Sequence, residues 1–223
     1  MDSKRSLPIL LAGQPPEFLV HDEEEACPYL PGQRARLPLR LPARPLRHAE
    51  MDARLRAGDR RNGPLLYRPT CPECDACRPL RLDVKRFVPS RAHRRILRQG
   101  DARLGVTAGP PLANAQRVDL YNTHLTGRGL ARSNAPIDFD GYQHFLADTC
   151  CDTFELRYTL DDQLVGVAIT DRSAAALSAV YCYYDPAHAR LSIGTYSILK
   201  QIELCQRLAC ATCTWACTSW APP

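Results

Sequence analysis

Apolar and polar residues alternate with a period of two along three stretches in the second half of the chain. The stretches cover residues 154–158, 164–170 and 175–184, and polar turns separate them. A period of two puts neighbouring side chains on opposite faces of a strand, so the pattern predicts three strands joined as an antiparallel meander. Residues 194–208 instead carry apolar side chains at helical spacing and predict an amphipathic helix, with Ile198 among the residues that face inward.

The first half of the chain has shorter patterns, and proline interrupts several of them. Residues 1–16 are polar and contain proline, which predicts a loose arm. The remaining patterns predict extended segments at 17–20, 35–41, 65–68 and 80–84, and helices at 45–55, 118–130 and 139–147. These elements predict an α+β protein with a small cysteine-rich N-terminal domain over residues 17–105 and an α/β domain over residues 106–208.

A further short helix is predicted between Ser90, a good N-cap, and Gly100, a good terminator. Four arginines in it fall at positions i, i+3, i+4 and i+7 and therefore share one face. They are Arg91, Arg94, Arg95 and Arg98. One interpretation is a solvated helix surface. The other is an anion-binding face, because like charges at these spacings repel one another in a free helix.

Composition places the chain among globular proteins. It has 223 residues, of which 45% are hydrophobic and 24% are charged. No apolar run approaches the roughly 20 residues needed to cross a bilayer, and the N-terminus lacks the pattern of a signal peptide. We therefore expect a cytoplasmic protein without a membrane partner, whose 11 cysteines are reduced thiols.

Basic residues are concentrated in one segment of the chain. Residues 78–98 hold eight basic residues and a single acid, Asp83, although the net charge of the whole chain is only +5. The rest of the chain is therefore slightly acidic. Such asymmetry favours a polyanionic partner, of which nucleic acid is the commonest.

Three cysteines follow a metal-ligand spacing. Cys71, Cys74 and Cys77 form a Cys-x2-Cys-x2-Cys run, and Cys27 comes beside it if the two N-terminal extended segments pair. Four thiolates complete a tetrahedral zinc site or hold an iron–sulfur cluster. The alternative is that one or two of these cysteines are free buried thiols, since cysteine is also a common small core residue.

Several longer motifs resemble one known family. They are Cys-Pro-Tyr-Leu-Pro at 27–31, Phe-Val-Pro-Ser-Arg-Ala-His-Arg-Arg at 87–95, Leu-Ser-Ala-Val-Tyr-Cys-Tyr-Tyr-Asp-Pro at 177–186 and Ser-Ile-Gly-Thr-Tyr-Ser-Ile-Leu-Lys-Gln-Ile-Glu at 192–203. These segments closely resemble the bacterial aspartate/glutamate leucyltransferases, which are relatives of the eukaryotic arginyl-tRNA–protein transferases. The resemblance implies an enzyme that moves leucine from leucyl-tRNA to the N-terminal Asp or Glu of proteins and so marks them for N-end-rule degradation.

The resemblance also implies a GNAT-type N-acyltransferase fold for the C-terminal half, in which a loop before a helix binds the donor through backbone amides. Residues 190–195 are the corresponding loop, and their glycine spacing departs from the pattern that binds acetyl-CoA. The 3′ end of tRNA is therefore the expected donor, and no nucleotide cofactor is expected. The candidate substrate-binding residues of this loop are Arg190, Gly194 and Thr195.

Tyr183, Tyr184 and Asp185 end the strand before this loop. They are either substrate-binding residues or a core aromatic pair with a turn aspartate. The sequence assigns no general base. Three other functions stay open: arginyl transfer from arginyl-tRNA, acetyl transfer from acetyl-CoA, and a non-catalytic zinc or iron–sulfur protein that binds nucleic acid.

The resemblance stops after Leu208. Residues 209–223 hold three cysteines and two tryptophans without an apolar period, and they predict neither a strand nor a helix. A shifted reading frame near Leu208 explains the segment better than a metal site of Cys210, Cys213 and Cys217, because GC-rich codons read in another frame can spell the residues of the family. We therefore expect an aberrant tail, a truncated domain without its C-terminal elements, an unpaired sheet edge, poor solubility and weak or no activity.

Overall fold

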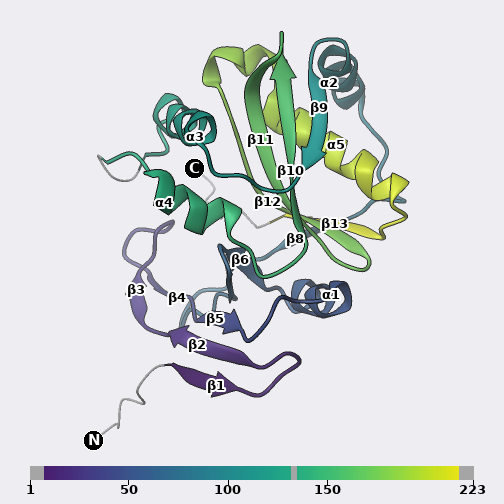
Figure 1. The fold of residues 1–223 in the computed structure, drawn as a ribbon. Coiled ribbons are helices and arrows are strands. Elements are labelled where there is room, and N and C mark those ends of the chain that lie inside the picture. The colour runs from purple at the N-terminus through teal and green to yellow at the C-terminus, as the bar shows by residue number, and fades with distance from the viewer. Residues whose placement is uncertain (1–7, 132–134, 216–223) are drawn as a thin grey trace, which may run out of the picture.

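The computed structural model describes residues 8–131 and 135–215, which form two main β-sheets (Figure 1). The strands of the smaller sheet are β1 (Ile9–Leu11), β2 (Glu17–His21), β5 (Leu39–Pro42), β6 (Arg60–Asn62) and β7 (Leu65–Tyr67). They are antiparallel in the order β1-β2-β5-β7-β6. Beside them lie the hairpin of β3 (Glu24–Ala26) and β4 (Arg34–Arg36) and the helix α1 (His48–Arg56).

The larger sheet has six strands. They are β8 (Leu80–Asp83), β9 (Gly105–Gly109), β10 (Thr153–Leu160), β11 (Gln163–Arg172), β12 (Ala176–Tyr184) and β13 (Thr212–Trp215). Their order is β8-β13-β12-β11-β10-β9, and all neighbours are antiparallel except β12 and β13, which are parallel. The predicted meander is confirmed as β10, β11 and β12.

Helices cover both faces of the larger sheet (Figure 1). They are α2 (Arg91–Asp101), α3 (Ala115–Gly127), α4 (Phe139–Tyr142), the π-helical turn η1 (Gln143–Ala147), the 3-10 turn η2 (Pro186–Leu191) and α5 (Ile193–Arg207). On one face α3 and α4 pack through Tyr121 and Tyr142 against Tyr183. On the other face α5 packs Ile193 and Tyr196 on the strands. None of these helices has the length and apolar character that a bilayer span requires.

Local sequence sets the start of α2 and its packing on α5. The Ser90 side chain accepts a hydrogen bond from the backbone N–H of His93 at 3.2 Å, which confirms the predicted N-cap. Gly100 lies against the ring of Tyr196, where an added Cβ would come within 2.3 Å. Because α2 docks so closely on α5, its opposite face is turned outward.

A buried ion pair joins the two sheets. Arg61 on β6 donates through Nε to both carboxylate oxygens of Asp171 on β11, at 3.0 and 2.9 Å, and each side chain is only 1% exposed. Nη1 of Arg61 also donates to the backbone oxygens of Gly63 and Asp148. Since a buried charge is costly without its partner, this pair holds the smaller sheet in one position against the larger one.

The domain boundary predicted at residue 105 does not separate the two sheets. β8 precedes it in the sequence but pairs with β13 in the larger sheet, and α2 packs on α5. The structure is a mixed α+β fold, and it does not confirm a separate cysteine-rich domain over residues 17–105. The arm predicted to be loose over 1–16 also differs, because the apolar residues Ile9–Leu11 pair with β2 as a strand.

The prediction that the chain after Leu208 forms no strand is wrong at residues 212–215. These residues are β13, which lies between β12 and β8 inside the larger sheet. Cys213 is fully buried there, and Thr214 is 4% exposed. Cysteine packs as a small apolar side chain and threonine favours strands, so Thr212, Cys213 and Thr214 fit between β12 and β8 without large apolar side chains.

The expected loss of a sheet strand therefore does not occur at this position. The shifted reading frame stays a prediction, and residues 216–223 of the predicted tail lie outside the described residues. Of the residues of α5 predicted to face inward, Ile202 and Cys205 are buried, whereas Ile198 is 39% exposed and Leu208 is 46% exposed. The buried face of this helix also carries Ile193 and Tyr196.

Candidate active site

Strand β12 contains a bulge near the middle of the larger sheet. Ile169 on β11 pairs with Tyr181, and the next residue, Thr170, pairs with Ala179, so Val180 is an extra residue without a partner on β11. Bulges re-aim side chains and are common beside active sites. Two cavities are lined by the same three residues, Ala179, Val180 and Tyr181, and they therefore meet at this bulge.

The first of them, the helix cavity, has a volume of about 680 Å³ and lies at the start of α5. Besides the bulge, its lining includes His124, Arg128, Tyr184, Ser192, Gly194 and Thr195. Ser192 has a left-handed φ of 52° and does not cap α5 with its side chain. The first backbone N–H groups of α5 have no intrahelical partner, and such a helix start favours anions.

His124 brings an ionisable group to the helix cavity. The residue is 5% exposed, its Nδ1 lies 2.9 Å from the carbonyl oxygen of Tyr184, and the backbone N–H of Tyr184 donates to the same nitrogen at 3.2 Å. Burial lowers the pKa of His124, the hydrogen bond with the Tyr184 backbone raises it and the charge of Arg128 lowers it, with a net decrease. Both backbone groups of Tyr184 therefore contact Nδ1, and a neutral imidazole keeps one ring nitrogen able to accept a proton.

The second, the interface cavity, has a volume of about 400 Å³ and lies between the two sheets. Its lining from the smaller sheet includes Asp59, Arg60, Arg61, Asn62 and Tyr67. The larger sheet contributes Ser178 and Thr214 as well as the bulge. This cavity therefore combines residues that lie more than a hundred positions apart in the sequence, and it contains several charged groups.

The predicted substrate-binding residues are not all at the cavities. Tyr184, Gly194 and Thr195 line the helix cavity. Arg190 is exposed in η2, and its carbonyl oxygen accepts a hydrogen bond from the Gln99 side chain on α2 at 3.5 Å. The arginine face of α2 is exposed as predicted and consists of Arg91, Arg94, Arg95 and Arg98. α2 contacts η2 and the start of α5 through its C-terminal end, where Gln99 and Gly100 lie.

Tyr183 and Asp185 line neither the helix cavity nor the interface cavity. Tyr183 is fully buried, and its hydroxyl shares a hydrogen bond with the hydroxyl of Tyr142. Asp185 accepts a hydrogen bond from the backbone N–H of Ala187 at 2.8 Å and so caps η2. Both side chains thus have structural contacts, and a part in substrate binding stays a prediction.

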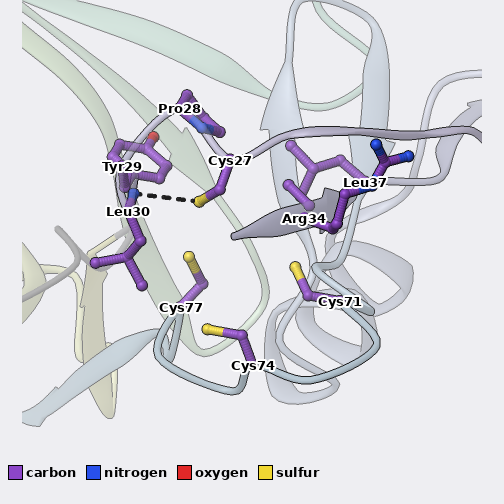
Figure 2. A pocket seen from close by; sticks show the side chains of 10 residues that line it. Cys27, Pro28, Tyr29, Leu30, Arg34, Leu37, Cys71, Cys74 and Cys77 are labelled. Atoms are coloured by element: carbon purple, nitrogen blue, oxygen red, sulfur yellow. Dashed lines mark hydrogen bonds between the residues drawn. The ribbon is translucent and has the colours of Figure 1, made fainter. Parts of the chain in front are cut away.

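The four cysteines predicted as metal ligands line one small cavity. Cys27 follows β3, whereas Cys71, Cys74 and Cys77 lie in the loop between β7 and β8. Figure 2 shows their sulfur atoms around a common space, and the backbone N–H of Leu30 donates to Cys27 Sγ at 3.4 Å. Within the described ranges, however, no three His, Cys, Asp or Glu side chains are arranged to hold a metal ion, so the ligand set stays a prediction.

Sequence reasoning missed His124 and Arg128 at the helix cavity and Arg60 and Asn62 at the interface cavity. His124 on α3 and Arg128, the C-cap of this helix, lie one turn apart, which their spacing indicates, but no local pattern brings α3 beside β12. Arg60 and Asn62 belong to the run Asp-Arg-Arg-Asn, which is typical of a solvated loop. The burial of Asp59, Arg60 and Arg61 depends on contacts with distant strands, and the sequence alone does not reveal them.

Two family models match the chain. The model described as "Arginine-tRNA-protein transferase, N terminus" matches residues 25–95, and the model described as "Arginine-tRNA-protein transferase, C terminus" matches residues 116–218. The first includes the cysteine cavity and the smaller-sheet side of the interface cavity. The second includes the β12 bulge and the whole lining of the helix cavity.

Curated relatives match most of the chain. It is 39% identical to the aspartate/glutamate leucyltransferase of Halorhodospira halophila, over 82% of this chain and 78% of that one. It is 38% identical to the aspartate/glutamate leucyltransferase of Thiobacillus denitrificans, over 82% of this chain and 75% of that one. The similarity therefore runs through both sheets.

A solved structure shares the fold of the larger part. The C-terminal domain of a putative lysylphosphatidylglycerol synthetase from Agrobacterium fabrum has a TM-score of 0.50 at 9% identity, over 65% of this chain and 47% of that chain. At this identity the likeness concerns the fold alone. The sequence matches support a conclusion beyond the fold. They establish that this chain belongs to the family of aminoacyl-tRNA–protein transferases that contains the aspartate/glutamate leucyltransferases.

Proposed function

We propose that this protein is a cytoplasmic leucyltransferase, which moves leucine from leucyl-tRNA to the N-terminal Asp or Glu of acceptor proteins and so marks them for degradation. Membership of the family supports the reaction class. The observation that carries the proposal is the meeting of two different cavities at the bulge of β12. An enzyme that transfers a group from tRNA to a protein needs a binding site for each substrate, and the two sites must adjoin where the reaction takes place. Two cavities that meet at one bulge fit this requirement.

The helix cavity fits the aminoacylated 3′ end of tRNA. The free N–H groups at the start of α5 favour a phosphate, and α2, which carries the arginine face, packs on α5 and η2. Exposed arginines bind phosphates without reading base sequence. We therefore assign the terminal nucleotide and its ester to the helix cavity and the preceding backbone to the arginine face.

The reaction needs no ATP because the leucyl ester is already activated. The acceptor α-amine has an ordinary pKa near ~8 and attacks the ester carbonyl carbon in its neutral form. The new C–N bond forms, the C–O bond to the ribose breaks, and the proton of the amine ends on the ribose oxygen. His124 is the one imidazole in the lining of either cavity, and its lowered pKa favours the neutral form that accepts a proton. Positioning and stabilisation of the oxyanion supply the rest of the catalysis.

The cysteine cavity is proposed as a structural zinc or iron–sulfur site with Cys27, Cys71, Cys74 and Cys77 as ligands. Four thiols around a common space support this assignment. Metal analysis after anaerobic purification should find about one zinc ion or one cluster per chain. Cys74→Ser should lose the metal and unfold the smaller sheet, whereas Cys150→Ser, in the core, should keep the metal. Folded wild-type protein without metal would contradict the assignment.

A transfer assay tests the proposed function. Labelled leucine on tRNA is offered together with peptides that begin with Asp, Glu or Ala, and transfer is expected to the two acidic peptides only. The same assay with arginyl-tRNA and with acetyl-CoA tests the two other donors. Absence of leucine transfer to the Asp and Glu peptides would contradict the proposal, and tRNA binding without any transfer would indicate a non-catalytic nucleic-acid-binding protein.

A further inference from the structure

We propose that the interface cavity is the acceptor subsite and that Arg60 binds the side-chain carboxylate of the N-terminal Asp or Glu. This inference rests on the proposed leucyl transfer and adds the residue that selects acidic acceptors. The observation behind it is a buried cation that pairs with no carboxylate among the residues that the structure describes. The ligand it requires is a carboxylate, and the established family supplies acceptors that carry one.

Three charged side chains line the interface cavity, and two of them are neutralised. The neutralised ones are Asp59, which pairs with Arg40 and Arg68, and Arg61, which pairs with Asp171. The third is Arg60, and no carboxylate of the residues described in the structure pairs with it. The wall of the cavity therefore holds one positive charge that no carboxylate of these residues neutralises.

Arg60 is buried in spite of this, with only 8% of its surface exposed. One Nη atom donates to the carbonyl oxygen of Cys77 at 2.8 Å, and the buried Nε has no hydrogen-bond partner. Removing a guanidinium from water is costly unless an anion and hydrogen-bond acceptors replace the water. A planar carboxylate can accept two parallel N–H bonds from the guanidinium fork, and it would meet both needs.

The position of the cavity fits an N-terminal residue. Its wall ends at Ala179, Val180 and Tyr181, where the helix cavity begins. An acidic residue carries its α-amine only a few bonds from its carboxylate, so a carboxylate held in this cavity keeps the amine near the bulge. A volume of about 400 Å³ also exceeds the size of one acidic side chain, which leaves room for the residues that follow.

The same arrangement rejects neutral acceptors. Asn and Gln have the shape of Asp and Glu but carry no charge, so they would leave Arg60 buried without an anion. A neutral acceptor is therefore disfavoured because its complex leaves the buried charge of Arg60 unpaired. An acidic acceptor is favoured because its carboxylate is attracted to that charge. Because the charge is shielded from solvent, added salt should screen this selection only weakly.

Steady-state leucine transfer at saturating leucyl-tRNA tests the proposal, with peptides that begin with Asp or with Asn as acceptors. The proteins compared are the wild type, Arg60→Gln, Arg60→Lys and Arg56→Gln. Arg56 is the matched control, because it is an arginine of the smaller part whose side chain is 66% exposed and pairs with Asp52. Arg60→Gln should lower kcat/KM for the Asp peptide by ~30-fold or more and change the Asn peptide little, since it removes one partner of a buried charge pair. The preference for Asp over Asn should then approach one, whereas Arg56→Gln should keep it.

Wild-type transfer to the Asp peptide is the internal check, since its absence would refute the leucyl transfer itself rather than the role of Arg60. A wild type that transfers while Arg60→Gln keeps the full preference for Asp would overturn the inference. Equal losses for both peptides with a fall in bound metal would overturn it too, because Arg60 would then only support the cysteine loop through Cys77. If Arg60→Gln does not fold, Arg60→Lys is the deciding variant. Its preference for the Asp peptide over the Asn peptide should be lower than that of the wild type but still above one. An unchanged preference in Arg60→Lys would refute the inference.

Discussion

The two cavities that meet on β12 are built in opposite ways. The helix cavity comes mostly from one continuous stretch, in which β12, η2 and the start of α5 follow one another. The arginines of α2, which we assign to the same substrate, are exposed. The interface cavity is assembled from β6, β7, β12 and β13, and its charges are buried. The helix cavity thus depends on local sequence, whereas the interface cavity depends on the docking of two sheets.

This difference matches two kinds of substrate. A tRNA is a large polyanion, and exposed arginines attract it over a long range in a way that salt weakens. The acceptor offers a single residue at a chain end, and a buried charge can select it at short range. Disturbing the sheet interface should therefore affect the acceptor side first, and disturbing the surface of α2 should affect the donor side alone.

The largest expected effect is the loss of stability when the buried ion pair between the two sheets is broken. Asp171→Ala leaves Arg61 buried without its anion, and we expect a loss of about 3–5 kcal/mol in the free energy of unfolding, measured with urea. Asp152→Asn is the control, because Asp152 is 36% exposed and its pair with Arg172 lies at the surface. That variant should lose less than about 1 kcal/mol.

A double variant completes this test. Replacing both partners with apolar residues, as in Arg61→Met with Asp171→Leu, should recover much of the stability lost in Asp171→Ala, because no charge is left unpaired. A double variant as unstable as Asp171→Ala would contradict the electrostatic explanation. The stability would then depend on the other hydrogen bonds of Arg61.

The next effect concerns the donor side. Arg91→Ala with Arg95→Ala should weaken tRNA binding by about tenfold at moderate salt and lower the slope of log affinity against log salt by about one to two units. The matched control is Arg56→Ala with Arg207→Ala, which removes two exposed arginines elsewhere. An unchanged slope in the α2 variant would show that its arginine face is only a solvated surface.

The smallest effect is the pH dependence caused by His124. Its folded-state pKa is lowered, so the unfolded chain takes up the proton first as the pH falls below ~6.5. The contribution of His124 to stability is therefore present above that pH and is lost during acidification. Between pH 7.5 and 5.5 the wild type should lose up to about 1 kcal/mol more than His124→Gln in urea unfolding. An equal loss in both proteins would contradict the effect.

Sequence reasoning succeeded where structure follows from a local period. The meander of β10 to β12, the helix α5 and the N-cap Ser90 all follow from patterns within a few residues. Of the residues that the motifs from 177 to 203 predict to bind substrate, Tyr184, Gly194 and Thr195 line the helix cavity, and their role in binding stays a prediction. These features are encoded by neighbouring residues and can be predicted without knowledge of tertiary contacts.

The features that were missed depend on distant contacts. Thr212–Trp215 has no strong apolar period, and β8 and β12 on either side are what make it a strand. In the sequence alone, Arg60 resembles a residue of a solvated loop. Its place in a cavity wall follows only from the folded structure, where residues of β6 and β12 line the same cavity. Tyr183 and Tyr184 are neighbours, yet one lies in the core and the other lines a cavity, because alternate residues of a strand face opposite ways.

The most direct test of the meeting of the two cavities is a larger side chain at their common wall. Ala179 lines both cavities, and Ala179→Leu should place a larger side chain where they meet. Ala187→Leu, an exposed residue of η2, is the matched control. If donor and acceptor react at the bulge, Ala179→Leu should keep tRNA affinity within about threefold of the wild type while kcat for leucine transfer falls by ~100-fold, because misplacing the reacting groups by about 1 Å has a cost of this size. A kcat for Ala179→Leu equal to that of the wild type would contradict a reaction at this bulge.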